Sequence, residues 1–333
     1  MTKQQLFEKL TEGKAIPGTL FVPILMHFAA RYIGRSYGEF ASDHKVLVEA
    51  NIRALEDFGM DMVSLISDPY RETAAFGARI KFEDEAVPRC LDKVIRNSDD
   101  IRELKIPDVY GNERTLDRIR GAEAYTRLLK GDVPVIGWIE GPLAEACDLA
   151  GVSEMFMMLM TDHDSSNLLL DKCTEFARIF AKAQIDAGAL VIGMGDAVCS
   201  QIDIDTYNRY VRDRHKEIIS YIHDLGGKVK LHICGNITHL LPSLKEIKAD
   251  IVDIDWQVSL DDAYEQLGPE TVLCGNINPV TVEDRDAAEV FRLSRDLIES
   301  QKGRRYIFSA GCEITVNTPK ENLLAMRQAS SMA

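Results

Sequence analysis

Short apolar runs alternate with longer stretches of helical periodicity along most of the chain. From residue 61 onward, seven runs are rich in valine and isoleucine and apolar at nearly every position: 61–66, 133–139, 189–195, 228–234, 249–255, 271–277 and 305–311. Such runs are typical of parallel strands that are buried on both faces. The stretches expected to form helices between them include 206–225, 237–247, 260–267 and 287–301. Strands that alternate with helices predict βαβ units.

The spacing of these elements predicts an α/β fold of the (β/α)8, or TIM-barrel, class. In the second half of the chain a strand and a helix recur roughly every 20–40 residues, and an eighth strand is expected within residues 76–82. A doubly wound sheet is the alternative, but no G-x-G-x-x-G motif follows an early strand. No Gly/Ser/Pro-rich linker divides the sequence, so residues 1–333 are interpreted as one domain with an N-terminal helical extension, residues 1–55.

Composition narrows the classes of function. The net charge of −14 disfavours nucleic-acid binding, which needs clustered lysine and arginine. No window of 18 residues is apolar enough to predict a membrane span, and residues 1–18 lack the apolar segment of a secretory signal. The seven cysteines are scattered rather than spaced as a disulfide framework. We therefore expect a cytoplasmic protein with reduced thiols.

Polar residues gather where the predicted strands end. In a barrel of this class, functional side chains lie at the carboxyl ends of the strands. The polar residues at these ends are Asp68, Glu140, Asp196, His232 with Cys234 and Asn236, Asp253 with Asp255 and Trp256, Cys274 with Asn276, and Cys312 with Glu313. Polar ends on seven strands predict an active-site mouth, in which Asp196 and Asp255 are the catalytic candidates. Asp253 and Asp255 are two residues apart, so either could position a substrate or support a metal-bound histidine.

The sharpest cluster is His232-x-Cys234 together with Cys312. Residues i and i+2 of a strand face the same side, so His232 and Cys234 can share one ligand, and Cys312 ends the last predicted strand. Two thiolates and one imidazole suit zinc and leave a fourth position for a substrate. Glu140 is the candidate for that position when no substrate is bound, and Glu313 is the second choice.

A cysteine at a strand end is more often a small buried apolar residue than a ligand. That interpretation is favoured for Cys147, Cys173 and Cys274, and it is left open for Cys199. His215 is expected on a solvated helix face, and Cys90 on a helix. On spacing alone, both a metal site and simple packing remain open for the H-x-C element.

Three stretches resemble the uroporphyrinogen decarboxylase superfamily, and within it the zinc- and corrinoid-dependent methyltransferases. They are LHICGNITHLL (231–241), LCGNINPVTV (273–282) and FSAGCEITVNTPKENLLAM (308–326). The resemblance implies a zinc ion held by His232, Cys234 and Cys312. Corrinoid-carrying domains of such systems display D-x-H-x-x-G, which this chain lacks, so the resemblance also implies a separate corrinoid protein as partner.

The chain departs from the decarboxylase pattern at two positions. Their M-R-Q-A-G-R-Y element is matched by residues 26–32, which keep Arg31 but have His27 in place of the first arginine. Their S-D-I aspartate is matched by Asp68, whereas their G-H-G element has become Ala-Gly-Cys-Glu at 310–313. The carboxylates of a porphyrinogen would be poorly paired, so tetrapyrrole decarboxylation is kept as the alternative function.

The resemblance predicts transfer of a methyl group between a small molecule and the cobalt of a corrinoid. The small molecule is a methyl donor, such as a methoxylated compound, or a thiol acceptor, and the direction of transfer is left open. The expected substrate contacts are Arg31, Asp68, Tyr70, Asn236, Trp256 and Asn276. A non-catalytic zinc-storage or corrinoid-protein-binding module is a further alternative, and a homodimer is left open.

Overall fold

Eight short parallel strands form the main sheet of the computed structural model, which describes residues 1–332. In spatial order they are β1 (Leu20–Phe21), β10 (Tyr306–Ala310), β9 (Val272–Ile277), β8 (Ile251–Ile254), β7 (Lys228–His232), β6 (Val191–Gly195), β5 (Val135–Glu140) and β2 (Val63–Ser64). Every neighbouring pair is parallel. At the seam between the two outer strands, the Asp61 N–H donates to Phe21 O at 2.9 Å. The sheet is therefore curled into a TIM-type barrel.

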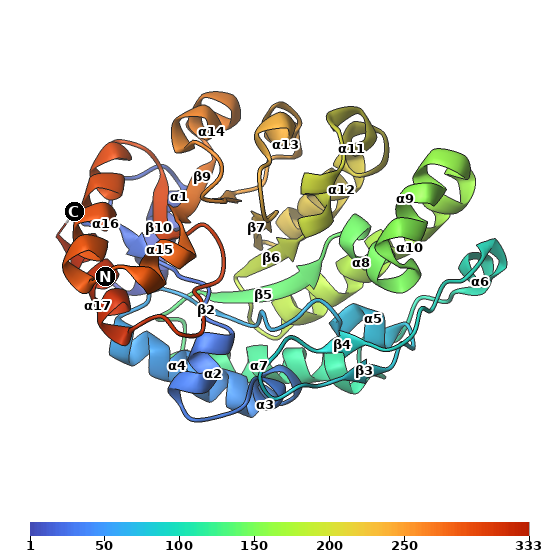
Figure 1. Ribbon diagram of the computed structural model, residues 1–333, viewed down its shortest axis with the longest axis horizontal. Coiled ribbons are helices and arrows are strands. Elements are labelled where there is room, and N and C mark those ends of the chain that lie inside the picture. Colours follow the sequence, from blue (N-terminus) through green and yellow to red (C-terminus); the bar gives the residue numbers. More distant parts are fainter. Residues whose placement is uncertain (333) are drawn as a thin grey trace.

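Helices surround the strands on the outside (Figure 1). They are α1 (Lys3–Thr11), α2 (His27–Tyr32), α3 (Tyr37–Ser42), α4 (His44–Phe58), α5 (Arg71–Ala75), α6 (Ser98–Glu103), α7 (Glu113–Leu129), α8 (Pro142–Ala150), α9 (Val152–Thr161), α10 (His163–Asp186), α11 (Ile204–Tyr210), α12 (Arg212–Asp224), α13 (Leu241–Ile247), α14 (Leu260–Leu267), α15 (Pro279–Asp284), α16 (Ala287–Ser300) and α17 (Lys320–Ser331), with 3-10 turns η1 (Ala197–Gln201) and η2 (Thr238–Leu240). Polar caps start many of them; Ser259, for example, accepts a hydrogen bond from the Asp262 N–H at the start of α14. Among residues 1–332, no helix combines the length and apolar composition that crossing a membrane requires.

Residues that point into the barrel change from apolar to polar along the strands. On β5, Ile136 and Trp138 belong to an apolar cluster inside the barrel, and Glu140 follows at the carboxyl end of the strand. Phe7 and Leu10 of α1 join the same cluster. The barrel interior is therefore a packed core with a polar layer at one end, as expected for this class of fold.

The predicted barrel is confirmed, but its eighth strand was placed wrongly. Residues 76–82 contain β3 (Ile80–Lys81), which pairs antiparallel with β4 (Arg89–Cys90) in a separate two-stranded sheet. The missing barrel strand is β1, inside the segment expected to be a helical extension. A strand of two residues leaves no periodicity in the sequence, so only its pairing with β10 reveals it.

Two smaller predictions also need correction. The helix expected at 206–225 is divided into α11 and α12 around Val211, and Cys90 lies in a strand rather than a helix. The other helices agree closely with the predicted ranges; α14 (Leu260–Leu267) coincides with 260–267.

Candidate metal centre

Three side chains with metal-ligating atoms converge where β7 and β10 end. His232 is the last residue of β7, Cys234 follows two residues later, and Cys312 follows β10. His232 Nε2 lies 3.1 Å from Cys234 Sγ and 4.0 Å from Cys312 Sγ, and the two sulfur atoms are 3.7 Å apart. The usual zinc bond lengths in a tetrahedral site require S···S and N···S separations of about 3.8 and 3.5 Å. The three separations therefore lie within about 0.5 Å of those that one zinc ion needs.

Two glycines allow this convergence. Gly235 follows Cys234 with φ +87°, a left-handed conformation that favours glycine, and its N–H donates to Asp255 Oδ2 at 2.9 Å. Gly311 precedes Cys312, and a Cβ there would lie 2.3 Å from the backbone nitrogen of Trp256. A side chain at position 311 would push the loop that carries Cys312 away from β8. The thiol of Cys312 would then move away from His232.

Asp253 on β8 holds His232 from the side opposite the thiols. The β7–β8 ladder pairs the two residues, and Asp253 Oδ2 lies 2.7 Å from His232 Nδ1. Burial lowers the pKa of His232, but hydrogen bonds with Asp253 and Cys312 outweigh that effect and raise it to about 9. Nδ1 faces the carboxylate and Nε2 faces the thiols, which is the orientation of a metal-bound histidine.

The two thiols interact before any metal binds. The hydrogen bond with Cys234 lowers the pKa of Cys312 to about 4, and the same interaction raises the pKa of Cys234. The contact thus favours the thiolate form of Cys312, and the thiolate is the form of cysteine that binds zinc.

We predict that Cys274→Ala and Cys199→Ala keep about one zinc ion per chain. Cys274 is buried on β9, and Cys199 is buried in a separate group with Asp196 and His215. Neither thiol belongs to the group that contains Cys234, so neither is needed as a ligand. Metal analysis of the dialysed variants measures this. If either variant loses zinc as completely as Cys234→Ala does, the ligand set is different.

Glu140 enters the barrel beside the metal centre but is engaged by an arginine. Its Oε1 lies 2.7 Å from Arg71 Nη2 and 3.3 Å from Trp138 Nε1, and its backbone N–H donates to Glu72 Oε1 at 2.8 Å. Burial raises the pKa of Glu140 well above its usual value. The donor atoms of His232, Cys234 and Cys312 lie within 4.8 Å of one another, and no oxygen of Glu140 lies within that distance of all three. Its role as fourth ligand stays a proposal.

Asp148 of α8 is half-buried near the same acidic residues and predicts a pH-dependent stability. Burial, and next the nearby Glu72, raise the pKa of Asp148 from 3.8 to about 8. In the unfolded chain this carboxyl group loses its proton near pH 4. The folded state therefore binds more protons between about pH 4 and pH 8, so its stability falls as the pH rises through this range.

The substitution Asp148→Asn should remove this loss of stability with rising pH, because asparagine has no proton to lose in this range. Relative to the unsubstituted protein, the variant should gain roughly 1 kcal/mol or more in free energy of unfolding between pH 5 and pH 8. Urea unfolding at both pH values measures the gain. Asp99→Asn is the matched control, because the Asp99 side chain is 80% exposed. An equal pH dependence in the protein and in Asp148→Asn would contradict the prediction.

The two predicted catalytic aspartates have structural partners. Asp196 is fully buried after β6, and its carboxylate accepts the N–H groups of Leu143 and Ala144 at the start of α8. His215 Nε2 lies 2.9 Å from Asp196 Oδ2 and is also fully buried, so the prediction of a solvated His215 was wrong. Asp255 accepts hydrogen bonds within the loops next to Cys234. Catalysis by Asp196 or Asp255 stays a prediction.

The predicted substrate contacts are divided between the barrel interior and its rim. Asp68 is buried and accepts a hydrogen bond from Arg114 Nη2 at 2.5 Å. Burial alone would raise the pKa of Asp68, but Arg114 and Arg71 outweigh it and lower this pKa to about 2. The Tyr70 backbone N–H donates a hydrogen bond to Asp68 Oδ1 at 3.1 Å. Asp68 is thus held by the protein itself, and the partly exposed Tyr70 is the more accessible of the two.

The other four predicted contacts lie nearer the surface. Arg31 and Asn236 are exposed, and Trp256 is 49% exposed beside the loop that carries Cys312. Asn276 Nδ2 instead donates to backbone oxygens of the β8 loop. Asn236 and Trp256, next to Cys234 and Gly311, remain proposals as contacts at the mouth.

Lys230 and Arg71 were missed by the sequence analysis. Lys230 lies two residues before His232 on β7 and therefore faces the barrel interior, where it is 2% exposed. A lysine two residues before a candidate ligand in a predicted strand faces the same side as that ligand, so the sequence did contain a usable signal. Arg71 is 0% exposed, but an arginine shortly after a polar strand end resembles an ordinary surface residue, so no local pattern marks it.

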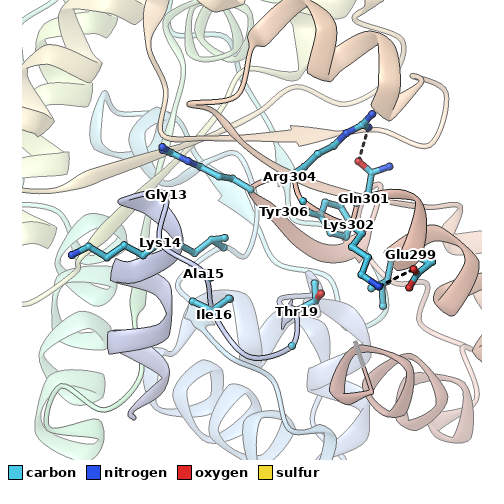
Figure 2. Close-up of a pocket in the computed structure, with 15 residues that line it drawn as sticks. Gly13, Lys14, Ala15, Ile16, Thr19, Glu299, Gln301, Lys302, Arg304 and Tyr306 are labelled. Atoms are coloured by element: carbon cyan, nitrogen blue, oxygen red, sulfur yellow. Dashed lines mark hydrogen bonds and ion pairs between the residues drawn. The ribbon is translucent and has the colours of Figure 1, made fainter.

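A cavity of about 400 Å³ lies at the other end of the barrel (Figure 2). It is bordered by the loop after α1 and by Tyr306, the first residue of β10. Two of its cations are already paired: Lys302 lies 3.1 Å from Glu299, and Arg304 donates to Gln301 at 3.1 Å (Figure 2). Because this cavity opens at the amino end of β10, it is separate from the metal centre at the carboxyl ends.

The sequence and the fold have counterparts among known proteins. A uroporphyrinogen decarboxylase of Carboxydothermus hydrogenoformans is 24% identical over 319 residues, which cover 91% of this chain and 90% of that protein. A methylcobamide:CoM methyltransferase, MtbA, of Methanosarcina acetivorans is 28% identical over 273 residues, 80% of this chain and 78% of that protein. The structure of a methyltransferase from Methanosarcina mazei has a TM-score of 0.91 and 20% identity, covers 100% of this chain and 99% of its own, and confirms the fold.

The match to a protein family extends over almost the whole sequence. The family model described as Uroporphyrinogen decarboxylase (URO-D) matches residues 2–331. This range includes all the strands of the barrel and the three residues of the metal centre. The chain therefore belongs to the uroporphyrinogen decarboxylase family.

Proposed function

We propose that the protein is a zinc-dependent methyltransferase that moves a methyl group between a small molecule and the cobalt of a separate corrinoid protein. The observation that carries this proposal is the spacing of His232, Cys234 and Cys312, whose donor atoms lie 3.1, 3.7 and 4.0 Å apart. This thiolate-rich set suits zinc with one position left for a reacting molecule. The methylcobamide:CoM methyltransferase relative supports the same chemistry.

The residues of this chain prepare the site for a reaction at a heteroatom. Zinc bound here would polarise the heteroatom that carries the methyl group, or would lower the pKa of an acceptor thiol. Cys312 supplies a thiolate, and Asp253 keeps Nε2 of His232 turned toward the sulfur atoms. The partly exposed Tyr70 and the exposed Trp256 are proposed to contact the small molecule.

Glu140 is proposed as a fourth ligand when no substrate is bound. The sheet register places Glu140 opposite Gly195 and Gly195 opposite His232, so the first and last share a row across three strands. Its Oε1 is held by Arg71, while Oε2 lies over Gly195, 3.4 Å from where a Cβ would stand. Glu313 is the second choice, although its Oε1 already accepts the His27 N–H at 2.9 Å.

The corrinoid is proposed to arrive on another protein. The chain contains no D-x-H-x-x-G motif, and the reaction needs cobalt close to the methyl carbon. The partner's cofactor would therefore approach the carboxyl ends of the strands, where Asn236 and Trp256 are exposed beside the metal centre. Such a complex forms and dissociates in each cycle, so we expect a small and partly polar interface.

The test is a methyl-transfer assay in which methyl donors are offered together with the reduced cobalt(I) form of a corrinoid protein, and thiols together with its methyl-cobalt(III) form. For the donors, the readout is formation of methyl-cobalt(III), and for the thiols it is loss of methyl-cobalt(III). The visible spectrum should change to that of methyl-cobalt(III) only when the zinc-loaded protein and one donor are present. His232→Ala should abolish the change, whereas Cys274→Ala, a residue outside the site, should retain it. Release of carbon dioxide from a porphyrinogen, without zinc or a corrinoid partner, would establish the alternative decarboxylase function suggested by the relative in Carboxydothermus hydrogenoformans.

A further inference from the structure

We propose that Lys230 and Asp253 form a charge-neutral clamp that positions His232 for zinc, with Lys230 as a positioning residue that acts through Asp253. This inference rests on the proposed zinc-dependent function and adds to it two residues that never touch the metal. It follows from the arrangement of three side chains inside the barrel, on the adjacent strands β7 and β8.

Lys230 and His232 approach the same carboxylate oxygen. Both lie on β7 and, two residues apart, face the barrel interior. The Lys230 ammonium group bonds to Asp253 Oδ2, and His232 Nδ1 lies 2.7 Å from the same atom. All three residues are buried, with exposed fractions of 2%, 7% and 5% for Lys230, His232 and Asp253.

The hydrogen-bonding capacity of these groups determines the orientation of the imidazole. An ammonium group only donates, so Asp253 Oδ2 must act as an acceptor. His232 then donates from Nδ1 to this oxygen, and Nε2 is left to face Cys234 Sγ, 3.1 Å away. The carboxylate thus selects the ring orientation that zinc requires.

Asp253 needs Lys230 because the carboxylate has few other partners. Within residues 1–332, Asp253 Oδ1 is buried without a hydrogen-bond partner, so Oδ2 carries the contacts of the side chain. A buried carboxylate close to two thiolates would be strongly unfavourable without a cation. The Lys230 ammonium group, which bonds to Asp253 Oδ2, supplies that cation. With zinc, two thiolates, Asp253 and Lys230, the formal charges sum to zero.

A second lysine–aspartate–histidine group provides a matched control. At the other end of the same strands, Asp250 lies 2.9 Å from Lys228 Nζ and 2.7 Å from His223 Nε2. The residue types are the same, although Lys228 bonds to Oδ1 and His223 to Oδ2 of Asp250. Lys228 begins β7 and Asp250 precedes β8, whereas His232 ends β7. Asp250→Asn therefore shows what happens when a group of this kind is disrupted at a place distant from the metal centre.

The experiment measures zinc affinity by competition with a chelator, alongside thermal unfolding of the zinc-free proteins. Asp253→Asn should weaken zinc binding roughly 10–100-fold, because it removes the fixed acceptor and leaves the Lys230 charge beside the ion. The double variant Lys230→Met/Asp253→Asn should bind zinc more tightly than Asp253→Asn alone, because the unpaired positive charge of Lys230 is no longer present beside the ion. Asp250→Asn should match the unsubstituted protein. Cobalt(II) substitution gives a second readout: the absorption bands should change in Asp253→Asn and not in Asp250→Asn.

The outcomes separate this inference from the proposed function. Zinc affinity of Asp253→Asn within about twofold of the unsubstituted protein, or a double variant no better than Asp253→Asn, would overturn the clamp while leaving the zinc site intact. Absence of zinc binding by the unsubstituted protein would instead overturn the proposed function itself. A loss of affinity in Asp253→Asn that follows only its loss of thermal stability, with unchanged cobalt spectra, would reduce Lys230 and Asp253 to a structural ion pair.

Discussion

Replacement of Cys312 with alanine is expected to remove most of the zinc from the protein, which should otherwise carry about one ion per chain. His232 Nε2 and Cys234 Sγ would remain 3.1 Å apart, but two donors cannot complete the tetrahedral set. Changes to residues that only support a ligand weaken binding roughly 10–100-fold, so loss of a ligand itself should exceed that range. Metal analysis after dialysis and chelator competition measure the effect.

The controls for this experiment lie in the same barrel. Cys274→Ala and Cys199→Ala test whether loss of any buried thiol has the same result. The thermal unfolding of zinc-free Cys312→Ala should be close to that of the zinc-free protein, because the thiol lies in a loop rather than in the packed interior. Full retention of zinc by Cys312→Ala would exclude Cys312 from the ligand set and would remove the main support for the proposed function.

Arg71→Met is expected to produce the largest loss of stability. Arg71 is completely buried, lies 2.7 Å from Glu140 Oε1 and 3.7 Å from Glu72 Oε2, and also bonds to the backbone oxygen of Asp68. Removing one partner of a buried ion pair costs about 3–5 kcal/mol, because the remaining charge has no compensation. A typical protein has a net stability of only about 5–15 kcal/mol, so the variant should approach the limit of folding. Urea unfolding measures this difference.

An exposed ion pair gives the comparison. Arg79 lies 2.9 Å from Asp92 Oδ2, but its side chain is 74% exposed. Arg79→Met should therefore change the free energy of unfolding by less than about 1 kcal/mol. If Arg71→Met were as stable as Arg79→Met, Glu72 and Glu140 would have to be accommodated without a cation, and the buried network described above would not stabilise the fold.

The barrel was predictable because its strands carry a strong local signal. Buried parallel strands have apolar residues on both faces, and the run at 133–139 covers all of β5 except its last residue, Glu140, while the run at 189–195 contains β6. The same argument failed for β1, because Leu20 and Phe21 form a strand too short for any periodicity. It also misplaced a barrel strand at 76–82, where β3 pairs with β4 outside the barrel. Pairing between distant segments decides such cases, and a local pattern contains no information about it.

Part of the metal centre was predictable for the same reason. The two-residue spacing of His232 and Cys234 placed both on one side of the strand predicted at 228–234. The strand itself ends at His232, and Cys234 lies in the loop that follows. Cys312 was grouped with them because it ends the last predicted strand, and the resemblance to a known family strengthened that grouping. The structure brings the donor atoms of all three residues within 4.0 Å of one another. Of the two nearby aspartates, either could have supported the histidine. Only the β7–β8 register shows that Asp253 reaches Nδ1, while Asp255 holds the N–H of Gly235.

By itself, the sequence determined the class of fold, the end of the barrel where polar residues gather, and a histidine and cysteine with the chemistry of a zinc site. These features depend on the local alternation of side chains, which a strand or helix converts directly into faces. The tertiary structure decided which charges are buried and paired: Lys230 with Asp253, and Arg71 with Glu140. The cost of a buried charge depends on its neighbours in space, which come here from different strands and loops, and no spacing along the chain records them.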